Sequence, residues 1–205
     1  ASSNQLHETV VRGTLSQFKE AEEIGRGDDQ ILMVFTQPAE AVKFCLLLRA
    51  NLQALTEDTG RPVTDRFGIH LGELMSGAPG NSALDNSLLK QHIDNCVRLV
   101  HVSEPKQILM TGPAFDAARQ SFKKDDLKKE DAVKIAALSW MNHGPYLLAG
   151  SEKPLEICEV AEAQNEPATP PANSDHAQRP ASDNDPTIWG WRPALGQVVP
   201  GTNFV

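Results

Sequence analysis

The sequence has no apolar run long enough to cross a membrane, and no hydrophobic segment typical of a signal peptide near its first residue. It has only three cysteines, Cys45, Cys96 and Cys158, which lie far apart, each in an apolar context. That spacing fits neither a zinc site nor a set of disulfides. These absences predict a cytoplasmic protein with buried, reduced thiols and no membrane segment.

Positive charge is also scarce, because 19 Lys and Arg residues stand against 27 Asp and Glu residues, for a net charge of −8. Nucleic-acid binding needs clustered Lys and Arg, so we expect no nucleic-acid partner. The one basic cluster, KKDDLKK at 123–129, is interrupted by acids and is typical of a solvated surface. The sequence has no P-loop, G-x-S-x-G, H-E-x-x-H or G-x-G-x-x-G motif, and so supports none of their chemistries.

The composition changes near residue 162. Residues 163–187 are rich in Pro, Ala, Ser, Asn and Asp and nearly free of large apolar side chains, which predicts a flexible linker after a domain at 1–162. Residues 188–205 contain two Trp and two Pro and are too short to fold alone. We expect this tail either to dock on the domain or to lead into a following one.

Predicted strands and helices alternate within residues 1–162. Apolar spacing predicts helices at 6–22, from Pro38 to about 55, at 87–102 and at 113–122, with strands at 30–35, 66–72 and 107–110 and a closing hairpin formed by GPYLLAG and LEICEV. The apolar run at 30–35 is typical of a central strand. This pattern predicts an α/β or α+β fold with helices on one or both faces of a sheet.

The strand at 66–72 has one apolar face and a second face that carries Gly68, His70 and Gly72. Glycine inside a strand often marks the close approach of another backbone. We therefore expect another element, from this chain or from a partner, to pack tightly on this face, with His70 as a packed, hydrogen-bonded side chain.

Two adjacent carboxylates, Asp28 and Asp29, occupy a glycine-containing turn before the strand at 30–35. Carboxylates fixed at a tight turn can bind a hard cation such as Mg²⁺. The alternative is that Asp and Gly are ordinary turn residues whose side chains bond nearby backbone groups.

Asp94 and Arg98 are four residues apart in the helix expected at 87–102, and they share a face. The planar fork of Arg suits phosphate recognition. The alternative is an exposed ion pair within one helix, which is worth only a few tenths of a kcal/mol.

Taken in order, four blocks of the sequence resemble the class III adenylate/guanylate cyclase catalytic domain. The blocks are GDDQILMVF with the helix that follows, RFGIHLGEL, IDNCVRLVHVSEPKQILMTGPAF, and HGPYLLAGSEKPLEICEV. They run from about residue 6 to 161 in the family's order. The resemblance implies a ferredoxin-like nucleotide cyclase fold with an antiparallel-rich sheet, and a homodimer that carries ATP or GTP between its protomers.

The resemblance implies phosphoryl chemistry in which a ribose 3′-hydroxyl attacks the α-phosphate and pyrophosphate leaves, with two Mg²⁺ or Mn²⁺ ions. Asp29 matches a metal ligand, and a slip of one residue would select Asp28. Arg98 matches the Arg that steadies the transition state, and Asp94 stands where an Asn orients the ribose. Further nucleotide-binding positions are Gly27 and Ser87, with Ser87 where a purine-reading carboxylate is usual.

Several family features are absent. Ala149 replaces a Lys that contacts the terminal phosphates, and Gly25 or Ile24 replaces the purine-reading Lys. The family's first strand, which carries the other metal Asp, has no counterpart in this sequence, so we expect a missing strand and an exposed sheet edge. The tail at 188–205 resembles the lead-in to a serine/threonine kinase domain.

Three hypotheses remain open. The domain is a cyclase that is active as a dimer once complete, or a degenerate cyclase-homology module that dimerises and regulates an attached protein kinase, or an unrelated ferredoxin-like domain. The choice between ATP and GTP cannot be read, because neither purine-selecting position carries its usual residue.

Overall fold

The computed structural model describes residues 3–27, 29–72, 82–122, 138–162 and 168–179. The elements are α1 (Ser3–Leu15), β1 (Ala21–Arg26), β2 (Ile31–Phe35), α2 (Pro38–Thr59), β3 (Phe67–Ile69), α3 (Ser82–Val102), β4 (Ile108–Thr111), α4 (Gly112–Ser121), β5 (Leu138–Leu148), β6 (Leu155–Glu162) and β7 (Ala177–Gln178). None of the helices in these ranges has the length and apolar content needed to cross a bilayer.

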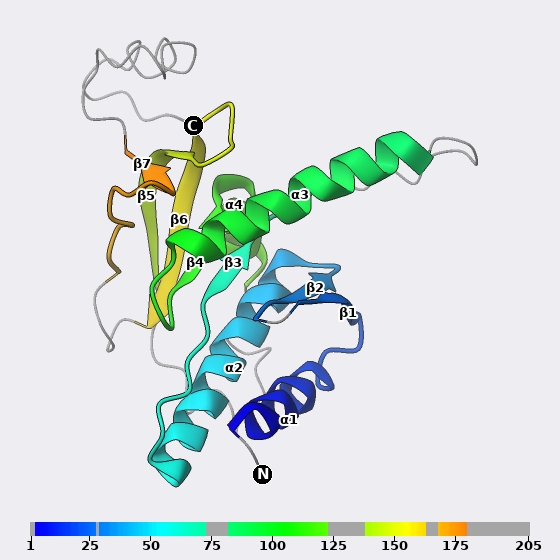
Figure 1. Cartoon of the computed structure of the whole chain (residues 1–205), viewed down its shortest axis with the longest axis vertical. Coiled ribbons are helices and arrows are strands. Elements are labelled where there is room, and N and C mark those ends of the chain that lie inside the picture. The colour runs from blue at the N-terminus through cyan, green and yellow to red at the C-terminus, as the bar shows by residue number, and fades with distance from the viewer. Residues whose placement is uncertain (1–2, 28, 73–81, 123–137, 163–167, 180–205) are drawn as a thin grey trace.

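The strands form two separate sheets (Figure 1). The larger sheet has the order β3-β4-β6-β5-β7, in which only β3 and β4 are parallel. The smaller sheet is the antiparallel pair of β1 and β2. The structure therefore confirms the predicted α+β class with an antiparallel-rich sheet and flanking helices.

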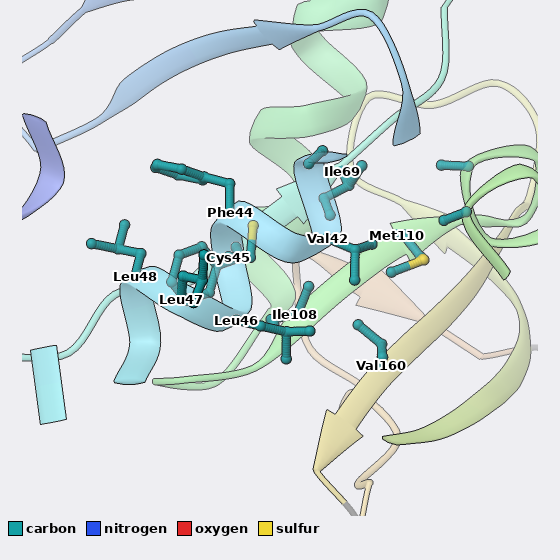
Figure 2. Packing of buried hydrophobic residues seen from close by; sticks show 14 of the residues in the cluster. Val42, Phe44, Cys45, Leu46, Leu47, Leu48, Ile69, Ile108, Met110 and Val160 are labelled. Carbon is teal, nitrogen blue, oxygen red and sulfur yellow. The ribbon is translucent and has the colours of Figure 1, made fainter. Parts of the chain in front are cut away.

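Both faces of the larger sheet are covered, so every residue of β4 is buried. Ile108 and Met110 point into a core shared with α2 and α4, and Figure 2 shows this packing around Val42 and Leu46. On the opposite face, Leu109 of β4 packs in a second apolar cluster with α3 and β5. The alternation of side chains along β4 thus divides the interior into two cores.

Helix α3 is the element that approaches the glycine face of β3. A Cβ added to Gly68 would lie 2.7 Å from the carbonyl oxygen of Cys96, and one on Gly72 would lie 2.5 Å from the His92 ring. Real Cβ atoms do not come so close to other heavy atoms. The predicted close approach is therefore confirmed, and the partner is a helix of the same chain.

The N-terminal prediction is wrong in part. The helix expected at 6–22 ends at Leu15, and residues 21–26 form β1, which pairs with β2. Pairing with the apolar β2 overrides the local helical pattern, as tertiary contacts commonly do. The strand expected at 30–35 is present, but within the described residues β1 is its one strand neighbour, so it is not central there.

Several other expectations lie at least partly outside the described residues. Helix α3 begins at Ser82, earlier than the predicted start at residue 87, and residues 73–81 before it lie outside the described residues. The missing first strand stays a prediction, as do the basic cluster at 123–129 and the tail at 188–205, which also lie outside.

Part of the predicted linker at 163–187 is packed on the sheet. Residues 168–179, which we call the strap, include β7, which pairs with Leu147 and Leu148 of β5. Ala177 is buried among the side chains of the second core. A segment poor in apolar residues can order here because backbone pairing and polar contacts replace the missing apolar burial. The domain boundary at 162 remains a prediction.

Candidate functional site

Arg98 lies on α3 and reaches across to the β5–β6 turn. Its Nε donates to the carbonyl of Ala149 at 3.0 Å and its Nη2 to the carbonyl of Gly150 at 2.9 Å. Its Nη1 donates to Asn95 Oδ1 at 3.0 Å. A guanidinium has five N–H groups, so these three bonds leave two for a further acceptor. Arg98 is thus held in one orientation and can still bind an anion.

The Asn95 contact belongs to a network that fixes the neighbouring protonation states. Because Arg98 only donates, the Asn95 atom facing it is the oxygen, and Asn95 Nδ2 faces His70 Nε2 at 3.4 Å. His70 Nε2 therefore accepts a hydrogen bond, and its proton lies on Nδ1, where it is donated to Thr111 Oγ1 at 3.0 Å. His92 Nδ1 lies 3.0 Å from the same Nε2.

The electrostatics agree with a neutral His70. Desolvation by burial, together with the neighbouring His92, lowers the pKa of His70 from 6.5 to about 4. A protonated His70 would lose its acceptor atom and would place an N–H group against the Asn95 amide N–H. His70 is therefore neutral at physiological pH, and it is the packed, hydrogen-bonded side chain that the sequence predicted.

The other two α3 candidates lie apart from this network. Asp94 is half-buried one turn before Arg98, yet Arg98 bonds Asn95 rather than Asp94, so the ion pair weighed as the alternative does not form in the structure. Ser87 is exposed and lies about three helical turns before Arg98, toward the N-terminus of α3. The structure places Asp94 close to Arg98 along the helix, and Ser87 distant from it.

The metal candidates lie in the β1–β2 turn. The Gly27 amide donates to the carbonyl of Gln30 at 2.8 Å, which closes the turn, and Asp29 is exposed. Asp28 lies outside the described residues. In the described part of the chain, no three His, Cys, Asp or Glu side chains gather into a group that could hold a metal ion. Among the described residues, Asp29 is the one carboxylate of this turn, so we derive no step through a metal.

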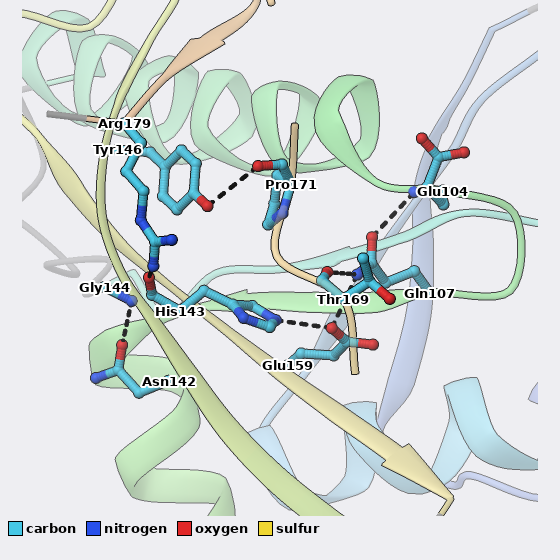
Figure 3. A network of polar contacts seen from close by, with 10 residues as sticks. All are labelled: Glu104, Gln107, Asn142, His143, Gly144, Tyr146, Glu159, Thr169, Pro171 and Arg179. Carbon is cyan, nitrogen blue, oxygen red and sulfur yellow. Dashed lines mark hydrogen bonds and ion pairs between the residues drawn. The ribbon is translucent and has the colours of Figure 1, made fainter. Parts of the chain in front are cut away.

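A second polar cluster lies on the same face of the sheet as α3, beneath the strap (Figure 3). Glu159 of β6 accepts from Gln107 Nε2 at 2.8 Å and lies 2.7 Å from His143 Nε2. Gln107 Nε2 also donates to the carbonyl of Thr169 in the strap, at 2.8 Å. All three side chains in the cluster itself are buried, and together they satisfy one another.

Sequence reasoning missed Asn95 and the role of the β5–β6 turn. Asn95 adjoins Asp94, and the resemblance directed attention to Asp94. Gly150 has φ +72°, a left-handed conformation that a glycine after LLA permits, so a turn was foreseeable there. The contact of Gly150 with Arg98, 52 residues earlier on α3, could not be foreseen from the sequence.

No family model and no curated protein matches this sequence. Solved structures do match it. A structure described as an adenylate/guanylate cyclase/hydrolase from Silicibacter pomeroyi aligns with a TM-score of 0.55 and 16% identity, over 78% of this chain and 83% of that chain. An adenylate cyclase from Trypanosoma brucei in its monomeric state aligns with a TM-score of 0.48 and 17% identity, over 79% of each chain.

The first of these similarities defines the fold. The chain has the mixed α+β fold of adenylate/guanylate cyclase domains, with a curled sheet and flanking helices. At 16% identity the similarity assigns architecture, and the reaction has to be argued from the side chains.

Proposed function

We propose that this chain is a class III nucleotide cyclase-like domain of cyclic-nucleotide signalling, which acts as a homodimer on ATP or GTP. One observation carries the proposal. Arg98 and Ala149 occupy two family positions expected at the nucleotide phosphates, and the fold brings them into hydrogen-bond contact across 51 residues. Because two independent sequence blocks converge on one place, the site assignment gains support.

In this proposal, Arg98 steadies charge on the transferred phosphoryl group with its two remaining N–H groups. Asp94, one turn earlier, faces the ribose. Asp28 and Asp29 serve as the candidate metal ligands, and Gly27 and Ser87 line the nucleotide. Since the resemblance implies a nucleotide between two protomers, Asp29 and Arg98 need not meet within one chain.

The second candidate is a degenerate module that binds nucleotide, dimerises and regulates an attached serine/threonine kinase domain. The observation that favours it is the position of Ala149. Because Ala149 carries no charge, it adds nothing to the positive charge that Arg98 presents to a triphosphate. Loss of such a preorganised charge typically costs about 2–4 kcal/mol of transition-state stabilisation.

A cyclase assay separates the two candidates. The full-length protein is supplied with ATP or GTP and Mn²⁺, and cyclic nucleotide is followed beside the Arg98→Ala variant. We expect product that falls at least about 100-fold in the variant, as for removal of a key electrostatic group. No product from a folded dimer that still binds nucleotide favours the regulatory module. A folded protein that neither turns over nor binds nucleotide overturns both.

A further inference from the structure

A single residue, Ala149, connects the strap to Arg98 through hydrogen bonds. We propose that residues 168–179 position the Arg98 guanidinium through the backbone of Ala149, so that the strap is a working part of the nucleotide site. This inference rests on the proposed function for its consequence, while the link itself is a property of the fold.

The strap is anchored along its length by contacts to the sheet (Figure 3). Near its start, the carbonyl of Thr169 accepts from Gln107, and the carbonyl of Pro171 accepts from the buried Tyr146 hydroxyl at 3.1 Å. Near its end, Ala177 is 1% exposed, and the Arg179 guanidinium lies 5.5 Å from the centre of the Tyr146 ring. These contacts distinguish the strap from a solvated linker.

Arg179 adds a further anchor, because its Nη2 donates to the carbonyl of His143 in β5. The Arg179 amide donates to Asn173 Oδ1 at 2.7 Å, which braces the strap on itself. The cation on the Tyr146 ring is favourable in its own right. The C-terminal half of the strap is thus bound to β5 on the side that leads into the β5–β6 turn.

Ala149 connects the strap to Arg98 with its two backbone groups. Its N–H donates to the carbonyl of His176 in the strap at 2.9 Å, and its carbonyl accepts from Arg98 Nε at 3.0 Å. The rings of His176 and His101, which lies one turn after Arg98 on α3, are 5.7 Å apart. The strap therefore meets both the turn and the helix that hold the guanidinium.

Fixing Ala149 fixes Arg98, because Nε and Nη2 bond two consecutive carbonyls of the same turn. An arginine held in advance at its site loses less freedom when it binds an anion. The two free N–H groups then point in a set direction. If the strap leaves β5, the turn loses one of its restraints and Arg98 becomes more mobile.

The first experiment measures this link without any nucleotide. Ala177→Glu puts a charge into the buried side of the strap, whereas Ala172→Glu makes the same change at an exposed strap residue. NMR follows hydrogen exchange at Arg98 Nε–H and at the Ala149 amide. We expect both to exchange faster in Ala177→Glu and to stay unchanged in Ala172→Glu. Arg179→Ala, which removes a surface anchor, is the milder variant should Ala177→Glu unfold.

The second experiment measures the consequence in the same full-length protein. Affinity for non-hydrolysable ATP and GTP analogues with Mn²⁺ is compared in Ala177→Glu, Arg98→Ala and the double variant. We expect strap release to weaken binding about tenfold when Arg98 is present, and to have no further effect when it is replaced. A merely structural role would weaken both backgrounds equally.

The outcomes separate the inference from the proposed function. Unchanged exchange at Arg98 after strap release overturns the positioning link, whatever the protein binds. Faster exchange with equal losses of affinity in both backgrounds overturns the role of the strap in the site. Faster exchange in a protein that binds no nucleotide supports the link and overturns the proposed function.

Discussion

At the scale of single residues, the protonation state of His70 is matched to the hydrogen bonds that its neighbours make. His70 accepts a hydrogen bond from Asn95 and donates one to Thr111, so it helps to position the Asn95 side chain that Arg98 contacts. The low pKa of His70 follows mainly from its burial. A network of this kind is stable only while each member keeps its own protonation state.

His70 predicts a specific acid sensitivity. The pKa of His70 is about 4 in the folded protein, compared with 6.5 for an unperturbed histidine. Between these pH values the unfolded chain is protonated at His70 and the folded chain is not. Stability should therefore fall as pH drops from about 6.5 to 4. His70→Gln keeps an acceptor but does not titrate. As the pH falls from about 6.5 to 4, the variant should therefore lose less stability than the unsubstituted protein. Urea unfolding at several pH values measures this, and a constant difference would contradict it.

At the scale of elements, the contact between β3 and α3 decides where the candidate site can form. Gly68 allows the helix backbone to lie directly on the strand, which brings Asn95 to His70 and Arg98 to the β5–β6 turn. A larger residue would push the helix outward by the width of its side chain. The position of Arg98 thus depends on a residue that never touches it.

Gly68→Ala tests this packing. Its Cβ would lie 2.7 Å from the Cys96 carbonyl and 2.9 Å from Leu99 Cβ, so we expect a loss of about 1–3 kcal/mol in the free energy of unfolding. Gly13→Ala is the control, because a Cβ there meets nothing within 4 Å and α1 should gain about 0.5–1 kcal/mol. Thermal unfolding of both variants gives the comparison, and equal stabilities would contradict the packing argument.

The helices and strands also show how much of the fold can be predicted from the sequence. Apolar period alone predicted α2, β4 and the β5–β6 hairpin, because these elements bury clear stripes. The apolar period gave the wrong prediction at residues 16–22, where pairing with β2 determines the structure. It also missed the strap, because the strap is held largely by backbone groups that leave no apolar pattern in the sequence. Of the site, Arg98 and the glycine face were predictable, whereas Asn95 and the Ala149 contacts depend on tertiary geometry.

At the scale of the whole molecule, two cores lie on opposite faces of one sheet, and two of the three cysteines lie in one of these cores. Cys45 and Cys158 are buried in the core shared by α2 and α4, and Cys96 is half-buried on α3. Burial raises the pKa of the Cys45 and Cys158 thiols to about 12 and that of Cys96 to about 11. All three are free thiols in the structure, as the sequence predicted.

Cys45 and Cys158 should report the opening of the core shared by α2 and α4. At pH 8 we expect a thiol reagent to react first with Cys96, and with Cys45 and Cys158 only as fast as the domain unfolds. Mass spectrometry of the labelled protein with and without urea measures the order. Rapid labelling of Cys158 in the native protein would contradict the packing of the sheet.

The contacts of Ala149 have a consequence for how such a site can change over evolutionary time. Both of its bonds use backbone atoms, and its side chain is exposed. The residue can therefore be exchanged for another without dismantling the framework around Arg98. On the proposed function, a change of side chain at this position would alter the charge beside the site while the backbone bonds that hold Arg98 stay intact.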